Sequence, residues 1–235
     1  MKKIVCILCA LTVLFLLSSC KNNTPTINKH KVVKTNISKD YVPEFIELLS
    51  EDFELSGLLS GYTLDEEHCY NVTPPQVAAE TDMKIFKFSD SSASFVIADG
   101  KIYILCTFLG GHGFVNAIPC DFDNDGNKDL LVASSWGSGL HRSNISIFNS
   151  VTKESTVIYD NSPTAETPAD LIVAQSTDNI FTNNPETDEK SYYWVLSVNI
   201  NVENNNWANL SYVVKGIEGY IEVKDGTPTF VPYQE

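Results

Sequence analysis

The sequence predicts an all-β fold, either a β-sandwich or a β-propeller-like arrangement, with one short helix near its start. From about residue 83 onward, short runs rich in β-branched and aromatic residues follow one another, and turn residues separate them. Two Asp-Gly pairs, Asp99-Gly100 and Asp225-Gly226, have the composition of tight hairpin turns. Because no segment with helical periodicity interrupts this series, we expect an all-β domain rather than alternating strands and helices.

Residues 1–19 have the parts of an export signal. Lys2 and Lys3 supply a positively charged start, and residues 4–17 form an almost unbroken apolar run. This run is shorter than the roughly 18–20 residues that a membrane-spanning helix needs. We therefore interpret residues 1–19 as a signal peptide that is removed on export.

The apolar run ends in Leu17-Ser18-Ser19-Cys20, which resembles the lipobox of bacterial lipoproteins. The resemblance implies cleavage before Cys20, a diacylglyceryl group on its thiol, and acylation of the new terminus by a fatty acid such as palmitate. Two or three acyl chains hold a protein on a membrane far better than one chain does. We expect a lipid-anchored protein on the cell membrane or outer membrane, with its domain outside the cytoplasm. An ordinary secretory signal is the alternative.

Charge separates the next two parts of the chain. Residues 20–40 are polar and carry five lysines and one acid, which predicts a flexible basic tether behind the lipidated cysteine. Residues 41–235 carry 9 basic against 29 acidic side chains, and we expect them to form a single acidic β-rich domain. Such a net charge repels nucleic acid and attracts cations, so nucleic-acid binding is excluded.

The predicted helix follows the tether directly. Asp40 can cap it, and Pro43 falls in the first turn, where the missing N–H costs nothing. Gly57 and Gly61 end the helical pattern, and residues 65–82 are too irregular to assign. The apolar residues at helical spacing are Val42, Phe45, Ile46, Leu49 and Phe53.

The predicted strands occupy most of the remaining chain. They are Met83–Phe88, Ser94–Ala98, Lys101–Phe108, Phe114–Pro119, Asp129–Ser134, Ser143–Phe148, Ser155–Tyr159, Asp170–Ala174, Tyr192–Asn199, Leu210–Lys215 and Gly219–Val223. Cys69, Cys106 and Cys120 lie in this part of the chain, and an odd number of thiols cannot all pair within it. One disulfide is compatible with export, whereas a buried free thiol is favoured for Cys106 because its surroundings are apolar.

The most specific motif of the chain lies between two predicted strands, at residues 121–130. It reads DFDNDGNKDL, with carboxylates at loop positions 1, 3, 5 and 9 and glycine at position 6. This pattern suits a hard cation such as Ca²⁺, because alternate residues of a tight loop point inward and glycine permits the sharp turn. A polar turn rich in Asp and Asn is the alternative interpretation. An EF-hand is excluded, because position 12 is Val132 instead of a bidentate Glu.

The loop and its flanks resemble one FG-GAP or VCBS-type repeat of integrin-like β-propellers, in which a DxDxDGxxDL loop joins two strands of a blade. The resemblance covers about forty residues and includes Gly113-Phe114 before the loop and Ile145-x-Ile147-Phe148 after it. It implies structural Ca²⁺ held by the main-chain carbonyl of Asn127 and by four side chains, Asp121, Asp123, Asp125 and Asp129. Because the chain contains one copy of the motif, a partial propeller and a sandwich with a borrowed loop both remain open.

Glycine-rich stretches on both sides of the loop contain a second group of candidate residues. The group comprises His112, Trp136, His141 and Arg142. If these residues share one rim of the domain, they could bind an anionic or sugar-like ligand, because Arg pairs with carboxylates and Trp stacks on sugars. The alternative is that the glycines shape hairpins, Trp136 packs, and Arg142 pairs with an acid.

Two classes of function follow from these patterns. The first is a membrane-anchored, calcium-stabilised binding or interaction domain of the cell envelope, whose partner is an extracellular ligand or protein. The second is an extracellular hydrolase of glycan or peptide, centred on His112, His141 and Arg142. The sequence has no GxSxG, HExxH or P-loop motif, so it gives no positive indication of an enzyme.

Overall fold

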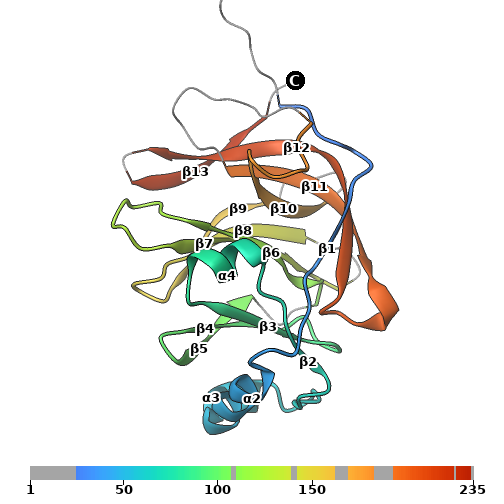
Figure 1. Ribbon diagram of the computed structural model, residues 1–235, viewed down its shortest axis with the longest axis vertical. Helices are drawn as coiled ribbons and strands as arrows, with labels where there is room; N and C mark the ends of the chain where they lie inside the picture. The colour runs from blue at the N-terminus through green and yellow to red at the C-terminus, as the bar shows by residue number, and fades with distance from the viewer. Residues whose placement is uncertain are drawn as a thin grey trace, which may run out of the picture.

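The computed structural model describes residues 25–106, 110–138, 142–161, 169–182, 193–224 and 226–233 (Figure 1). About half of these residues lie in antiparallel strands, and the described helices are short, so the predicted all-β class is confirmed. The signal peptide and Cys20 lie outside the described residues. No helix in the described ranges has the length and apolar character needed to cross a membrane.

The strands form three sheets, and apart from the first strand each sheet is made from strands that follow one another in the chain. The N-terminal sheet contains β2 (Cys69–Asn71), β3 (Lys84–Phe88), β4 (Ser94–Ala98) and β5 (Lys101–Cys106). The central sheet contains β6 (Gly113–Cys120), β7 (Asp129–Trp136), β8 (Arg142–Phe148) and β9 (Ser155–Asp160). The C-terminal sheet contains β10 (Asp170–Gln175), β11 (Tyr193–Val202), β12 (Leu210–Lys224) and β13 (Thr227–Pro232), and β1 (Val32–Lys34) joins it beside β12.

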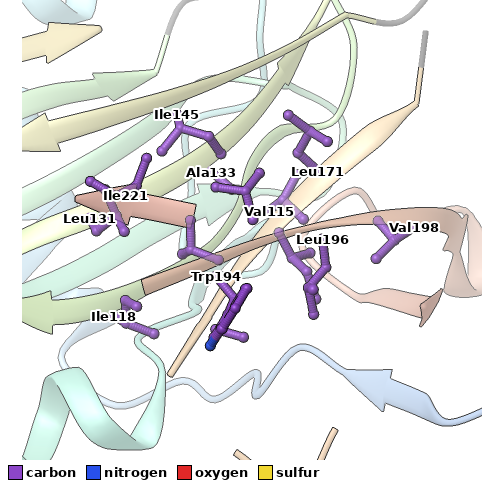
Figure 2. Packing of buried hydrophobic residues seen from close by; sticks show 14 of the residues in the cluster. Val115, Ile118, Leu131, Ala133, Ile145, Leu171, Trp194, Leu196, Val198 and Ile221 are labelled. Atoms are coloured by element: carbon purple, nitrogen blue, oxygen red, sulfur yellow. The ribbon is translucent and has the colours of Figure 1, made fainter. Parts of the chain in front are cut away.

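The three sheets are stacked face to face, and α2 (Val42–Glu51) and α3 (Phe53–Leu58) lie at one end of the stack (Figure 1). Alternation of side chains along each strand gives the central sheet two apolar faces. One face packs on the C-terminal sheet, and Leu131, Ile145 and Trp194 belong to the same buried cluster (Figure 2). The other face packs on the N-terminal sheet through residues such as Phe114 and Val132.

The outer face of the N-terminal sheet is covered by helix instead of by another sheet. Phe45 of α2 stacks on Phe86 of β3 with ring centroids 4.4 Å apart, and it also contacts Phe88. These rings are buried, and Val42 and Leu49 join them in a third core. Since this face is occupied by α2, the described sheets form an open, propeller-like stack and not a closed ring of blades.

The strand predictions agree with the structure except at the C-terminal sheet. The predicted strands 210–215 and 219–223 form one strand, β12, which pairs with β11 through two register shifts. These bulges bend the strand without ending it, so Gly216 and Gly219 both lie within the strand. At Gly219 an added Cβ would lie 2.3 Å from the carbonyl oxygen of Val231, so only glycine fits there. The strands β1, β2 and β13 were not predicted.

The prediction of a flexible tether is wrong for residues 27–38. β1 pairs with β12 in register Val33↔Tyr212, the Asn28 N–H donates to Ile180 O, and Ser38 pairs with Asn71. The physical reason is that β13 pairs only with the second half of β12, which leaves the first half as an open edge. Open edges expose unpaired N–H and C=O groups, and the basic N-terminal segment covers them.

The helical region also differs from the prediction. The N-cap of α2 is Tyr41, in a left-handed conformation, and not Asp40. Asp52 ends α2 and begins α3, because its side chain accepts hydrogen bonds from the N–H groups of Glu54 and Leu55. Phe53 therefore leaves the apolar face and is 91 % exposed. A further helix, α4 (Pro75–Glu80), begins at the proline pair in the segment that could not be assigned.

The three described cysteines are buried free thiols. Burial in apolar surroundings raises the pKa of the Cys69 and Cys106 thiols to about 12, so both stay protonated at neutral pH. The favoured interpretation of Cys106 as a buried thiol is confirmed. All three cores lie within residues 27–233, so a chain that starts at Lys21 keeps every packed face described above.

Candidate metal site

The acidic motif closes the hairpin between β6 and β7. Cys120 and Asp129 form the last residue pair of the two strands, and residues 121–128 make the connecting loop. Asn124 and Gly126 adopt positive φ angles of 58° and 87°, which turn the chain sharply back on itself. Asn and Gly are the residues that tolerate this left-handed region best, so the loop sequence matches its backbone.

The turn brings three carboxylates together. Single oxygens of Asp121, Asp123 and Asp125 all lie within 4.8 Å of one another. Calcium binds oxygen at about 2.3–2.6 Å, so two oxygens on one ion lie at most about 5 Å apart. The spacing of the three carboxylates therefore fits a single calcium ion.

Hydrogen bonds within the loop hold these carboxylates in place. The Gly126 N–H donates to Asp121 Oδ2 and the Asp125 N–H donates to Asp123 Oδ1, and both hydrogen bonds are 3.2 Å long. The side chain and backbone N–H groups of Asn127 both donate to Asp125, and they lower the pKa of its carboxyl group. All three carboxylates are thus oriented by N–H donors of their own loop before any ion binds.

One oxygen of this group is left without a partner. Asp121 Oδ1 is inaccessible to solvent and has no hydrogen-bond partner among the described residues. A buried carboxylate oxygen without a donor carries a desolvation penalty, which a bound cation would remove. This orphaned oxygen, and not merely the local charge density, indicates that the residues present fit a cation.

Asp129, the fourth predicted carboxylate ligand, accepts a backbone hydrogen bond in the structure. It is the first residue of β7, only 2 % exposed, and its Oδ1 accepts the N–H of Ser150 at 2.7 Å. Burial raises the pKa of this carboxyl group, and the charges of Asp123 and Asp125 raise it further. Asp129 lies close behind the loop but outside the group of three converging carboxylates.

The second group of candidate residues lies at the opposite end of the same hairpin. His112 is buried just before β6, with Nε2 3.7 Å from Asp170 Oδ2 and its ring 5.6 Å from the ring of Trp207. Ser135 Oγ donates to Asp170 Oδ1 at 2.7 Å. Asp170 therefore joins the central sheet to the C-terminal sheet, and His112 faces into this junction.

Trp136 and Arg142 lie together at the adjoining ends of β7 and β8. The Arg142 guanidinium lies 5.1 Å from the centre of the Trp136 ring, and Trp136 Nε1 donates to Asn144 Oδ1 at 3.0 Å. Trp136 is half-buried, and the described partner of Arg142 is this ring and not an acid. His141 lies outside the described residues.

The described part of this rim does not provide a nucleophile activated by a base. Ser135 donates to Asp170 and not to His112, whereas a serine nucleophile needs a base that takes its proton. The polar groups instead bridge the sheets to one another. This arrangement gives no support to the hydrolase interpretation.

Sequence reasoning did not identify Lys87, which is fully buried between the N-terminal and central sheets. Its Nζ donates to the carbonyl oxygens of His112 at 2.7 Å and Phe114 at 3.1 Å. Burial lowers the pKa of this amine to about 7. The only signal in the sequence is its strand position, because Lys87 shares a face of β3 with buried Ile85.

The chain matches no protein-family model, no curated protein and no solved structure. Two features remain on which function can be argued: the three converging carboxylates at one end of the β6–β7 hairpin, and the buried polar junction around Asp170 at its other end.

Proposed function

We propose that this protein is a calcium-stabilised binding domain, held outside a bacterial membrane by lipid attached to Cys20. The observation that carries the calcium part is the convergence of three carboxylates, one of which has a buried oxygen without a hydrogen-bond partner. Asp121, Asp123 and Asp125 would hold the ion. Bound calcium supplies positive charge that turns the mutual repulsion of these side chains into attraction.

The role proposed for calcium is structural. The loop joins two long strands of the central sheet, and this sheet contributes to both of the sheet–sheet cores. Fixing the loop therefore stabilises the hairpin on which the stack is built. An ion at one hundred times its dissociation constant would stabilise the folded state by about 2.7 kcal/mol.

A binding role is favoured over catalysis by the way the remaining polar groups are used. His112, Asp170 and Ser135 contact one another between sheets, which is the behaviour of a structural junction. The strongly acidic domain would keep cations nearby and would be repelled by anionic surfaces, so a lipid at Cys20 and the basic segment behind it would provide the membrane attachment.

Thermal unfolding with calcium and with chelator tests the calcium site. We expect calcium to raise the melting temperature by about 5–10 °C over EGTA, because 1 kcal/mol corresponds to roughly 2–4 °C in a domain of this size. Asp121→Asn should remove this gain. In EGTA the same variant should melt slightly above the wild type, because it relieves repulsion among the three carboxylates.

Asp82→Asn is the matched control, since Asp82 is an exposed carboxylate outside the loop. It should leave the calcium gain unchanged. Equal melting temperatures of the wild type in calcium and EGTA would refute the proposed site, and so would a full calcium gain in Asp121→Asn.

The anchor is tested separately by expressing the full chain in bacteria and comparing it with Cys20→Ala. Mass spectrometry of the mature wild type should show an N-terminal peptide that begins at Cys20 and carries lipid. The variant should lose the lipid and leave the membrane fraction. A mature wild-type protein that lacks lipid would contradict the anchor without affecting the calcium proposal.

A further inference from the structure

The structure contains a mainly apolar pocket of about 300 Å³ that is separate from the acidic loop. It lies among β1, the start of α4, β6 and β10, and the segment 178–180 closes one side. An apolar pocket of this size with a few polar groups is typical of a small-molecule site. Its apolar walls include Val33, Val72, Pro75, Val115, Ile118 and Ile180.

Two of the polar residues in this pocket already have partners. The side chain of Asn116 donates to Val173 O at 2.7 Å and accepts the Val173 N–H at 3.0 Å. Asp178 accepts hydrogen bonds from Gln76 Nε2 at 3.1 Å and from the Gln175 N–H at 2.8 Å. Both residues therefore hold the walls together, which preforms the pocket.

Tyr212 also lines the pocket, and its side chain is only 6 % exposed. No hydrogen bond joins its hydroxyl to another described residue, and the hydroxyl is not one of the buried polar atoms that lack a partner, so it is open to a molecule in the pocket. Burial and the nearby charge of Asp178 raise the pKa of this phenol to about 12, so it remains a hydrogen-bond donor at neutral pH.

We propose that this pocket binds a small uncharged molecule with an apolar body and one oxygen that accepts a hydrogen bond from the Tyr212 hydroxyl. The lining contains one carboxylate, Asp178, and one amine, Lys34, so it has no excess charge that would favour an ionic ligand. A charged head group would also lose its hydration against the apolar walls. For comparison, a dry apolar cavity of about 150 Å³ is large enough for benzene, so this pocket can hold a ring with a substituent.

This proposal rests on the binding role proposed above and names its ligand class, but it does not depend on the calcium site. Binding can be measured by NMR titration of the chain from Lys21 to Glu235 with benzyl alcohol and with toluene. These two probes have the same ring and differ by one oxygen. We expect both to bind saturably, benzyl alcohol more tightly, with shifts confined to residues that line the pocket.

Two variants test separately what the Tyr212 hydroxyl and the apolar walls contribute to binding. Tyr212→Phe should weaken benzyl alcohol about fivefold and leave toluene within twofold, because it removes one neutral hydrogen bond. Val33→Trp should weaken both probes at least tenfold by filling the pocket. Its matched control is Val32→Trp, because Val32 is 54 % exposed on the opposite side of β1 and lies outside the pocket lining.

Titrations are done in calcium and in EGTA at a temperature where circular dichroism shows a folded domain in both. Absence of saturable binding by a folded protein would overturn the pocket proposal, and so would an equal loss of both probes in Tyr212→Phe. Saturable binding in EGTA together with unchanged melting in calcium would retain the pocket and refute the calcium site.

Discussion

The two ends of the β6–β7 hairpin use polar side chains in opposite ways. At the loop end, Asp121, Asp123 and Asp125 converge, and one buried oxygen has no protein partner. At the other end, Asp170 and Ser135 bond to each other across two sheets. Polar groups that bond to each other within the protein stabilise the fold, whereas three carboxylates gathered around an unpartnered buried oxygen suit a cation.

The difference is also the reason why we propose a metal ion at the loop end and not at the other end of the hairpin. Asp170 brings a single carboxylate into its junction, and its described partners donate hydrogen bonds or lie at ion-pair distance. The loop brings three carboxylates whose only described donors are its own N–H groups. Charge at the loop end is therefore uncompensated in the absence of a cation.

The largest expected effect tests the junction. Asp170→Ala should reduce the free energy of unfolding by about 2–3 kcal/mol, because it leaves buried polar groups of Ser135 and His112 without this partner. Urea denaturation measures the loss, which should be the same in calcium and in EGTA. Ser135→Ala should cost less, about 1 kcal/mol. A loss that appears only in calcium would show that the two ends of the hairpin are coupled.

The next effect is a pH dependence of stability that arises from Lys87. This residue lies against the Asp170 end of the hairpin, where it contacts His112 and Phe114. Its folded pKa of about 7 lies below the unfolded value near 10.5, so the unfolded state binds more protons between these values. Stability should therefore rise by about 2 kcal/mol from pH 7 to pH 9, since one pKa unit corresponds to about 1.4 kcal/mol.

Above pH 9 the change of stability with pH reverses its sign. The Cys69 and Cys106 thiols have folded pKa values of about 12, so in this range only the unfolded state loses their protons and stability falls. Urea titrations across this range should thus show a maximum near pH 9. Lys87→Met should abolish the rise and keep the fall. If stability still rose between pH 7 and pH 9 in Lys87→Met, another titrating group would be its cause.

A smaller effect distinguishes Asp129 from the three loop carboxylates. Asp129→Ala should cost about 1–2 kcal/mol in EGTA, because the buried Ser150 N–H loses its acceptor. Asp129→Asn keeps an acceptor oxygen and should cost less in EGTA. Calcium titration of Asp129→Asn then tests the ligand role implied by the family resemblance. Unchanged calcium affinity would confine the site to Asp121, Asp123 and Asp125.

Local patterns in the sequence predicted much of the fold. Short runs rich in β-branched and aromatic residues predicted the strands of the central sheet, and the Asp-Gly pair at 99–100 forms a tight turn with positive φ at both residues. The loop motif named four carboxylates, and Asp121, Asp123 and Asp125 converge in the structure, because their spacing in a tight turn is set by neighbours in the chain.

Contacts between distant segments were not predictable in this way. β1 is three residues long, and it forms because the first half of β12 would otherwise be an open edge. The pairing of Asp170 with Ser135 joins residues 35 positions apart, and no local pattern encodes it. The Tyr212 hydroxyl became a candidate only when the pocket around it was defined.

The smallest predicted effect lies at the rim where Arg142 covers the Trp136 ring. Arg142→Ala should reduce the free energy of unfolding by about 0.5–1 kcal/mol, the usual range for an exposed cation–π contact. Arg142→Lys keeps the charge and should lose less. Because this contact is far from the loop along the strands, the calcium gain in melting temperature should be unchanged in both variants. A reduced gain would mean that the two ends of the hairpin are not independent.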